Sequence, residues 1–177
     1  VISLEHDKIV FEALKHNCEN YIDKIKPFNY SISNTSENKF VYYDTLTGST
    51  SLIEPNENKN IRKNFTVKDY NVGTFSKDMS KCINLDDLID KNNLSHVDLI
   101  KSDCEGSEPE MVMGLNKNVQ KVKYFTIDVG PERNGERTDN QVITLLEERN
   151  FQIIHDPRAS KENTRVVIAK NKKFLFN

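Results

Sequence analysis

The stretch Val97–Leu115, VDLIKSDCEGSEPEMVMGL, constrains the fold more than any other part of the chain. It opens with an apolar run typical of a strand buried in a parallel sheet, and Lys101 marks the point where that strand leaves the core. Asp103, Glu105 and Gly106 follow at the strand's carboxyl end. The sequence therefore predicts a buried strand that carries acidic side chains into a tight turn.

A helix is predicted to begin directly after this turn. Ser107 and Glu110 have the spacing of a capping box, in which each side chain bonds a backbone N–H of the first helical turn. Gly114 falls near the expected helix end, where a left-handed residue is favoured. The apolar stripe that would face the core consists of Met111, Val112 and Leu115.

The acidic residues of the turn are candidates for a functional site. In open α/β sheets ligands bind just beyond the carboxyl ends of the strands, so Asp103 and Glu105 are placed to contact a substrate or cofactor. An alternative is that both carboxylates only cap backbone N–H groups, since acids are common at helix starts. Cys104 lies between them, and a cysteine there more often fills space than reacts.

A second buried strand is predicted at Val122–Val129, with Asp128 near its carboxyl end. The turn-rich segment Gly130–Arg137 follows, and loops of this kind often close over a site. Thr138 and Gln141 form a second capping box, so a helix is expected to start there.

The N-terminus reads as Val1–Glu5, a short strand ending in an acid, with a helix opening at Asp7. An acid at the tip of such a strand is the usual partner for the ribose hydroxyls of a nucleotide-like cofactor. The alternative for Glu5 is a solvated strand end.

The remaining segments alternate between strand-like and helix-like patterns. A polar cluster at Gly48–Ser51 can line a pocket or simply form a turn, and Glu54–Lys63 has the composition of a disordered loop. The other expected elements are a strand at Pro27–Asn34, a hairpin at Lys39–Ile53, an irregular or edge strand at Val72–Ile83, a short helix at Leu85–Asp90, and two antiparallel edge strands at Phe151–Ile154 and Thr164–Ala169.

This order of elements predicts a doubly wound, mostly parallel α/β sheet with an antiparallel C-terminal pair. The length of 177 residues suits a single domain, 1–177.

The formal charge of −2, without a basic stripe, gives no indication of a nucleic-acid partner. No run approaches the roughly 18 apolar residues of a membrane span, and no signal peptide pattern opens the chain, so we expect a cytoplasmic protein. Three widely spaced cysteines suggest neither disulfides nor a zinc site.

The string Ile100–Glu108, IKSDCEGSE, closely resembles the IDxEGxE signature of FkbM-type S-adenosylmethionine-dependent methyltransferases. The resemblance covers roughly Val1 to Ile154. Weaker matches in the same order and spacing are Leu14 with Asn17, Ser33 with Asn34, and Leu85–Leu88.

This resemblance implies a Rossmann-like class I methyltransferase sheet of seven strands, with S-adenosylmethionine as the cofactor. By analogy, Glu5 holds the cofactor's ribose hydroxyls, Ser33 and Asn34 flank its adenine, and Asp103 with Cys104 lies beside its methionine part.

The implied reaction is O-methylation of a hydroxyl on a sugar, lipid or small metabolite. Positioning donor and acceptor in line supplies much of the catalysis. A carboxylate of Asp103, Asp128 or Glu105 can also take the acceptor's proton, directly or through a bound cation. A divalent cation is possible but not implied, no metal ligands are assigned, and the sequence does not decide which acid acts.

One departure from the family pattern concerns the N-terminus. The family places a strand and a glycine-rich turn before the strand of Glu5, and this chain has no such segment. We therefore expect a methyltransferase-like domain that lacks its first strand and is an N-terminally truncated part of a longer protein.

Two other functions are compatible with the sequence. The first is a non-catalytic methyltransferase-like module that serves as an interaction surface. The second is a two-metal nuclease that uses Asp103 and Glu105, with Asp128 and Asp156 as the further acids.

Overall fold

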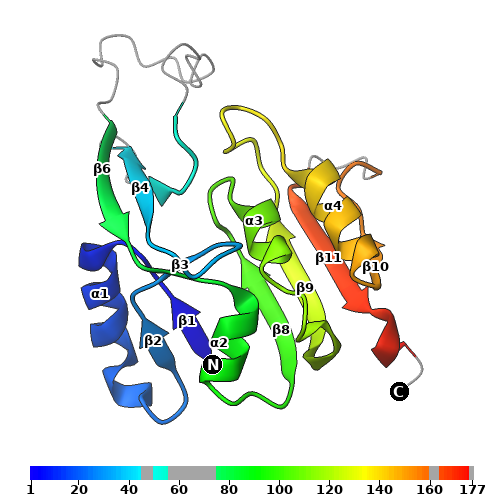
Figure 1. Cartoon of the computed structure of the whole chain (residues 1–177), viewed down its shortest axis with the longest axis horizontal. Coiled ribbons are helices and arrows are strands. Elements are labelled where there is room, and N and C mark those ends of the chain that lie inside the picture. The colour runs from blue at the N-terminus through cyan, green and yellow to red at the C-terminus, as the bar shows by residue number, and fades with distance from the viewer. Residues whose placement is uncertain (45–49, 56–74, 160–163, 176–177) are drawn as a thin grey trace.

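A mixed sheet carries the C-terminal half of the chain in the computed structural model, which describes residues 1–44, 50–55, 75–159 and 164–175 (Figure 1). Strands β8 and β9 run parallel, whereas β11 is antiparallel to both of its neighbours, β9 and β10. The predicted antiparallel C-terminal pair is confirmed, with β10 at the edge. In spatial order the sheet contains β10 (Phe151–His155), β11 (Val166–Asn171), β9 (Val122–Asp128) and β8 (Val97–Ser102).

The N-terminal half contains three smaller ladders. The first two are parallel pairs and the third is an antiparallel group that includes the predicted hairpin. Helix α1 connects the strands of the first pair. The elements are β1 (Ile2–Leu4) with β2 (Lys26–Phe28), β3 (Ser31–Ile32) with β7 (Cys82–Ile83), and β5 (Thr50–Ser51), β4 (Lys39–Asp44) and β6 (Phe75–Ser80), with α1 spanning Lys8–Cys18 and a 3-10 turn at Glu19–Tyr21.

The predicted sheet is divided in the described residues, which form four separate ladders. Within those residues β1 pairs only with β2, and β8 pairs only with β9, so the sheet is interrupted between them. In Figure 1 the strands β2, β1, β8, β9, β11 and β10 follow one another from left to right. Leu99 on β8, which is an edge strand of the four-stranded sheet, is 54% exposed.

The core lies between the four-stranded sheet and its helices. Phe125 and Phe151 are fully buried and meet edge to face with ring centroids 5.2 Å apart. Burial of each large apolar side chain contributes about 1.5–3 kcal/mol. Leu85, Leu88 and Ile89 are buried as predicted. The helices are α2 (Leu85–Lys91), α3 (Glu108–Met113) and α4 (Asp139–Glu148), with 3-10 turns at Val119–Lys121 and Lys172–Phe174.

Both predicted capping boxes are wrong. Ser107 and Thr138 occupy the N-cap positions of α3 and α4, but neither side chain bonds the helix backbone. The Thr138 hydroxyl donates instead to Glu108, and Glu110 pairs with Arg133. These tertiary partners replace the local bonds that the spacing predicts.

Gly114 ends α3 with φ −72°, so the left-handed conformation predicted there is also wrong. The glycine is needed for a different reason. A Cβ at this position would lie 2.6 Å from the Ser33 carbonyl oxygen and 3.1 Å from Asn84 Cβ. Close approach of two backbones therefore explains this glycine.

Helix α1 begins as predicted, because the Asp7 carboxylate accepts hydrogen bonds from the N–H groups of Ile9 and Val10. Its predicted inward face is largely absent. Only Cys18 is buried in α1, and Val10 is 50% exposed. None of the helices in the described ranges is both long enough and apolar enough to cross a membrane.

Candidate active site

The acidic turn after β8 contains two consecutive residues with positive φ angles. Glu105 has φ 50° and Gly106 has φ 96°. A Cβ at Gly106 would lie 3.0 Å from the Arg133 backbone nitrogen, so a side chain is excluded both by conformation and by space.

Glu108 holds this turn together. Its Oε1 accepts hydrogen bonds from the N–H groups of Cys104 at 3.1 Å and Gly106 at 3.0 Å, and its Oε2 accepts one from the Thr138 hydroxyl at 3.1 Å. The side chain is 1% exposed, and burial raises the pKa of its carboxyl. The carboxylate that caps the turn is therefore Glu108. This favours the reading in which Asp103 and Glu105 serve another purpose.

The sequence already contained a signal for Glu108, because it is the last acid of the signature Ile100–Glu108. Its role in the turn is not evident from the sequence. Spacing alone does not distinguish a buried acid at the start of a helix from an acid on the exposed face of a helix.

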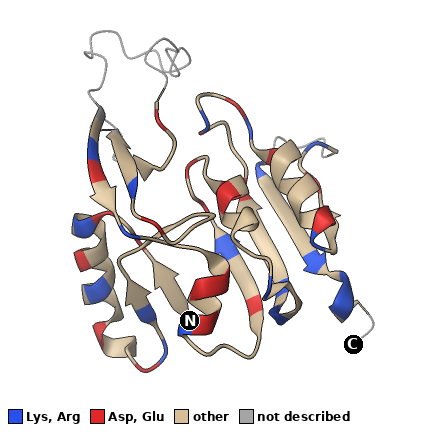
Figure 2. Cartoon of the chain, in the orientation of Figure 1, with Lys and Arg blue, Asp and Glu red and all other residues tan. Residues whose placement is uncertain are grey.

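The structure brings the three catalytic candidates together. Ser102 on β8 is in register with Ile127 on β9, so the next residues, Asp103 and Asp128, sit at neighbouring strand ends. The Asp103 side chain is 47% exposed, and its ion-pair contact is a long one, 3.9 Å to Lys101 Nζ. Figure 2 shows acidic segments at the turn into α3 and in the loop after β9.

Glu105 belongs to the same electrostatic group. Burial raises the pKa of its carboxyl most, and the negative charges of Asp103, Glu132 and Glu108 raise it further, whereas Arg165 lowers it. A carboxyl with a raised pKa holds and releases protons closer to neutral pH, which suits proton transfer.

Arg165, which directly precedes β11, contributes a cation to the group, and no motif in the sequence marks it as a site residue. Its Nε and Nη2 donate to Asp128 Oδ1 at 3.1 Å and 3.0 Å, and Nη2 also donates to Glu132. Asp128 Oδ1 accepts a third bond from the Gly130 N–H at 2.9 Å. Asp128 is therefore held in place by three donors, in contrast to Asp103.

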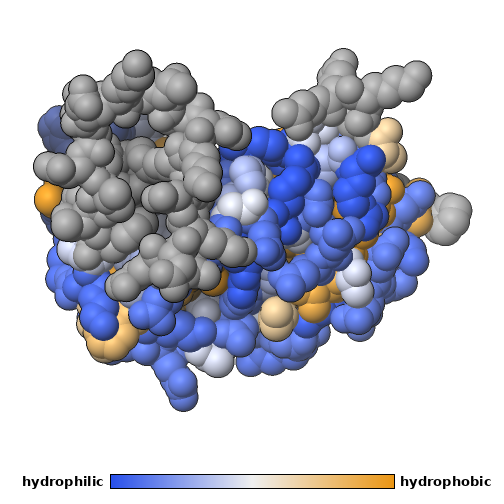
Figure 3. Space-filling view, turned by 90° about the horizontal axis from the view of Figure 1, so that it is seen from above, coloured by the Kyte–Doolittle hydropathy of each residue, from blue (hydrophilic) through white to orange (hydrophobic). Residues whose placement is uncertain are grey.

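The loop after β9 is held beside the turn by hydrogen bonds. The Arg133 guanidinium forms two bonds to the Glu110 carboxylate, at 2.8 Å and 2.9 Å, and one to the Gly106 carbonyl at 3.0 Å. Asn134 Nδ2 donates to the Glu54 carbonyl at 3.3 Å. Seen from this edge, Figure 3 shows hydrophilic residues over much of the described surface.

The polar cluster predicted at Gly48–Ser51 reaches the turn through one member. Ser51 Oγ donates to the Glu105 carbonyl at 2.6 Å. Gly48 and Ser49 lie outside the described residues, as does most of the predicted loop Glu54–Lys63.

Glu5 lies at the carboxyl end of β1, on the other side of the interruption in the sheet. Its Oε1 accepts a hydrogen bond from the Asp7 N–H at 2.8 Å and lies 3.7 Å from His6 Nδ1. Asn29 fixes the backbone here by donating to the carbonyls of Glu5 and His6. The structure therefore places Glu5 in a different local group from Asp103 and Asp128.

Ser33 and Asn34 form a small polar group with Lys39. The Lys39 ammonium donates to Ser33 Oγ and to Asn34 Oδ1, both at 2.7 Å. Ser33 is fully buried, whereas Asn34 is exposed.

Cys104 is half-buried and its Sγ lies 2.8 Å from Ser102 Oγ. Burial raises the pKa of the thiol to about 12. A thiol with this pKa has almost no thiolate near neutral pH, which favours the space-filling reading over a reactive one.

The described residues contain no group of three or more His, Cys, Asp or Glu side chains arranged to hold a metal ion. Asp156, the fourth acid of the nuclease alternative, is bound by Arg158 through contacts of 2.7–3.2 Å. The structure therefore offers no support for that alternative.

Comparison with known proteins identifies the family. The sequence pattern of the methyltransferase FkbM domain matches residues 1–153, which is most of the chain. The chain belongs to the FkbM methyltransferase family. This match confirms the resemblance that Ile100–Glu108 indicates. The family is one of methyltransferases.

A solved structure agrees with this assignment at the level of the fold. The methyltransferase FkbM from Methylobacillus flagellatus KT superposes with a TM-score of 0.52 at 16% sequence identity. The match covers 96% of this chain and 36% of that one, so the chain spans about a third of the length of that protein. A comparison with curated proteins gives no match.

Proposed function

We propose that this chain forms part of an S-adenosylmethionine-dependent O-methyltransferase that acts on a hydroxyl of a sugar, lipid or small metabolite. The observation that carries the proposal is the pair of acidic strand ends, Asp103 and Asp128, in a chain of the FkbM methyltransferase family. Carboxylates at the ends of adjacent parallel strands are suited to orient and deprotonate a hydroxyl beside a cofactor.

We propose a different role for each of the three acids. Asp103, which is exposed and only weakly paired, is the proposed proton acceptor, and Glu105 is the proposed second acid of the relay. Asp128, held by Arg165 and Gly130, is proposed to orient the acceptor. In-line methyl transfer needs little more than this positioning.

The residues present fit one end of the cofactor. The Asp7 N–H occupies one carboxylate oxygen of Glu5, and the second oxygen remains for a ribose hydroxyl. Ser33 and Asn34 fit the adenine less well, because Lys39 already bonds both of them. When bound, the cofactor supplies an electrophilic methyl group, and Asp103 with Cys104 is proposed to lie on that side.

We also propose that a further strand belongs between β1 and β8, as the Rossmann-like sheet of this family requires. Within the described residues β1 and β8 each have one edge without a neighbouring strand, and Leu99 on β8 is exposed. Both observations support this proposal. Hydrogen exchange of the β1 and β8 amides, compared between residues 1–177 and the protein produced from its whole reading frame, tests it. Slower exchange at both strands in the whole protein is expected, and equal rates would contradict it.

Calorimetry with S-adenosylhomocysteine tests the cofactor, again with the whole protein. Glu5→Gln should weaken binding about ten- to hundredfold, the loss expected for hydrogen bonds to a charged group. Asp98→Asn is the matched control, because Asp98 is an exposed acid on β8 with 78% of its side chain accessible. Equal affinity in Glu5→Gln and the native protein would refute the ribose assignment.

Transfer of a labelled methyl group tests the reaction class. Sugars, lipids and small hydroxylated metabolites are incubated with labelled S-adenosylmethionine, and the products are treated with alkali. An O-methyl ether keeps its label in alkali, whereas a methyl ester loses it. Cofactor binding without transfer to any hydroxyl would favour the alternative of a non-catalytic interaction module.

A further inference from the structure

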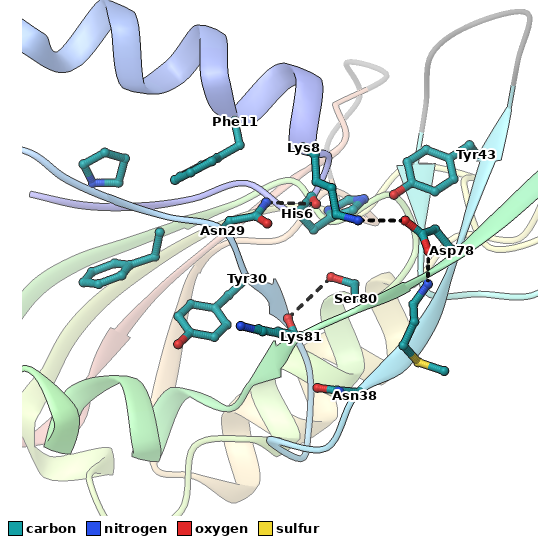
Figure 4. Close-up of a pocket in the computed structure, with 13 residues that line it drawn as sticks. His6, Lys8, Phe11, Asn29, Tyr30, Asn38, Tyr43, Asp78, Ser80 and Lys81 are labelled. Carbon is teal, nitrogen blue, oxygen red and sulfur yellow. Dashed lines mark hydrogen bonds and ion pairs between the residues drawn. The ribbon is translucent and has the colours of Figure 1, made fainter.

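A cavity of about 520 Å³ lies between α1, β2 and the strands β4 and β6, apart from the acidic strand ends (Figure 4). Its volume is within the range of small-molecule sites in proteins. The proposed methyl transfer uses none of the residues that line it. Those that matter here are Phe11, Phe28, Asn29, Tyr30 and Lys81.

Three aromatic rings form the apolar part of the wall. Phe28 and Tyr30 lie with ring centroids 6.1 Å apart and planes tilted by 38°. Lys91 fixes Tyr30, because its ammonium lies 4.9 Å from the ring centroid and donates to the phenol oxygen at 2.8 Å. Phe11 faces them from α1 in Figure 4. Preordered aromatic walls favour a flat aromatic ligand.

One hydrogen-bond acceptor on this wall is free. Both amide hydrogens of Asn29 are used, one by the Glu5 carbonyl at 2.9 Å and one by the His6 carbonyl at 3.0 Å. These bonds fix the amide so that Oδ1 has no partner among the described residues. An N–H or O–H donor on a ligand would satisfy it.

Two lysines line the cavity. Lys8 is paired with Asp78 at 3.1 Å, whereas Lys81 has no ion-pair partner within the described part of the chain. The carboxylates of Glu5 and Asp7 are also near, because their charges act on the lining residue His6. The ammonium group of Lys81, and not the net charge of the cavity, is therefore what can pair with the anionic group of a ligand.

From this combination we infer that the cavity binds a planar aromatic carboxylate with a ring O–H or N–H donor. The ring lies against Phe11, Phe28 and Tyr30, the carboxylate faces Lys81, and the donor bonds Asn29. The cavity adjoins the proposed ribose residue Glu5, because the lining residues Asn29 and His6 contact it, but the proposed methyl transfer uses none of the lining residues. The inference therefore rests on its own observations and stands whether or not the proposed methylation is correct.

Calorimetry with 4-hydroxybenzoate as the probe tests the site. Saturable binding is expected, and Lys81→Gln should weaken it about fivefold, the loss expected for a solvent-accessible ion pair. Lys77→Gln is the matched control, because Lys77 lies on β6, the strand that directly precedes Lys81, sits 4.8 Å from the Phe40 ring centroid and does not line the cavity. This control should bind as the native protein does.

Two ligand comparisons and one variant test the remaining contacts. Benzoate should bind more weakly than 4-hydroxybenzoate, and cyclohexanecarboxylate more weakly than benzoate. Phe11→Leu keeps an apolar helix former and should still weaken the aromatic probes. Absence of saturable binding, equal affinity in Lys81→Gln, or competitive displacement by S-adenosylhomocysteine would each overturn the inference, the last by assigning the cavity to the cofactor.

Discussion

The Arg165 guanidinium and the Asp128 carboxylate are joined by two hydrogen bonds, from Nε at 3.1 Å and from Nη2 at 3.0 Å. Arg165 precedes Val166, which is in register with Asp128 across the antiparallel strands β11 and β9. The same guanidinium also bonds Glu132. A single cation just before the C-terminal strand β11 therefore pairs with two acids beside the acidic turn.

Arg165→Gln should raise the pKa of two neighbouring carboxyls. The positive charge of Arg165 lowers the pKa of Glu105 and of Glu132, and burial raises both, so its removal leaves the raising effects unopposed. Stability should fall by no more than about 1 kcal/mol, because the side chain is half-exposed. Carboxyl-carbon NMR titration measures the pKa change.

Arg158→Gln provides the control for this titration. Arg158 pairs with Asp156, and it should leave the titration of Glu105 and Glu132 unchanged. If Arg165→Gln also left both titrations unchanged, the cluster would not be electrostatically coupled as the structure indicates.

Glu108 should make the protein less stable as the pH rises. Burial raises its folded pKa above the unfolded value, so the folded state holds the proton longer than the unfolded chain. Its contribution is therefore fully present below the unfolded pKa of 4.5 and is lost as the pH rises through the folded pKa. Urea denaturation across this pH range measures the effect.

Glu108→Gln removes the ionisation and should flatten this part of the pH dependence. It should also cost about 1–3 kcal/mol, because one carboxylate acceptor becomes an amide donor that faces existing donors. Thr138→Val keeps the acid but removes the hydroxyl that lowers its folded pKa, so the loss of stability should extend to higher pH and be larger in total. A Gln variant with the native pH slope would disprove this assignment.

Gly114→Ala should destabilise the protein by about 1–3 kcal/mol, the usual cost of overpacking. The new Cβ would lie 2.6 Å from the Ser33 carbonyl oxygen. This oxygen belongs to the backbone, so it cannot move away as the end of a flexible side chain could. Gly135→Ala is the matched control, with φ 83° but no atom within 4 Å of the new Cβ, so only backbone strain of about 1 kcal/mol is expected. Similar costs in the two variants, measured by urea denaturation, would contradict the close approach at Gly114.

The sequence predicted those parts of the fold in which local pattern and tertiary environment agree. The strand Val122–Val129 and the helix at Leu85 have periodic apolar residues, and these positions are buried in the structure. The predicted burial of the strand at Val97 is wrong in part, because Leu99 on β8 is 54% exposed and Val97 and Ile100 are only partly buried. The acidic turn was also predictable, since Asp103, Glu105 and Gly106 follow a buried strand directly.

Capping and pairing were less predictable because they depend on contacts between distant segments. Thr138 has the spacing of a cap, yet its hydroxyl donates to Glu108, thirty residues earlier. Arg165 lies 37 residues after Asp128, and only the antiparallel return of β11 brings the two together. No short motif encodes such a partner.

His6 should give the protein a second pH dependence, of opposite sign to that of Glu108. Burial lowers its folded pKa below 6.5, although the charges of Glu5 and Asp7 act against this. The unfolded chain therefore takes up a proton first, so stability is fully present above pH 6.5 and falls as the pH decreases through the folded pKa.

His6 Nε2 is also buried without a hydrogen-bond partner among the described residues, and such a group costs about 1–3 kcal/mol. His6→Phe should remove the acid-side loss and raise stability at pH 7, as measured by urea denaturation at pH 5 and pH 7. His16→Gln, at a position with 79% of the side chain exposed, should keep the native slope between these pH values. A His6→Phe variant that loses stability in parallel with the native protein would show that this histidine is not the titrating group.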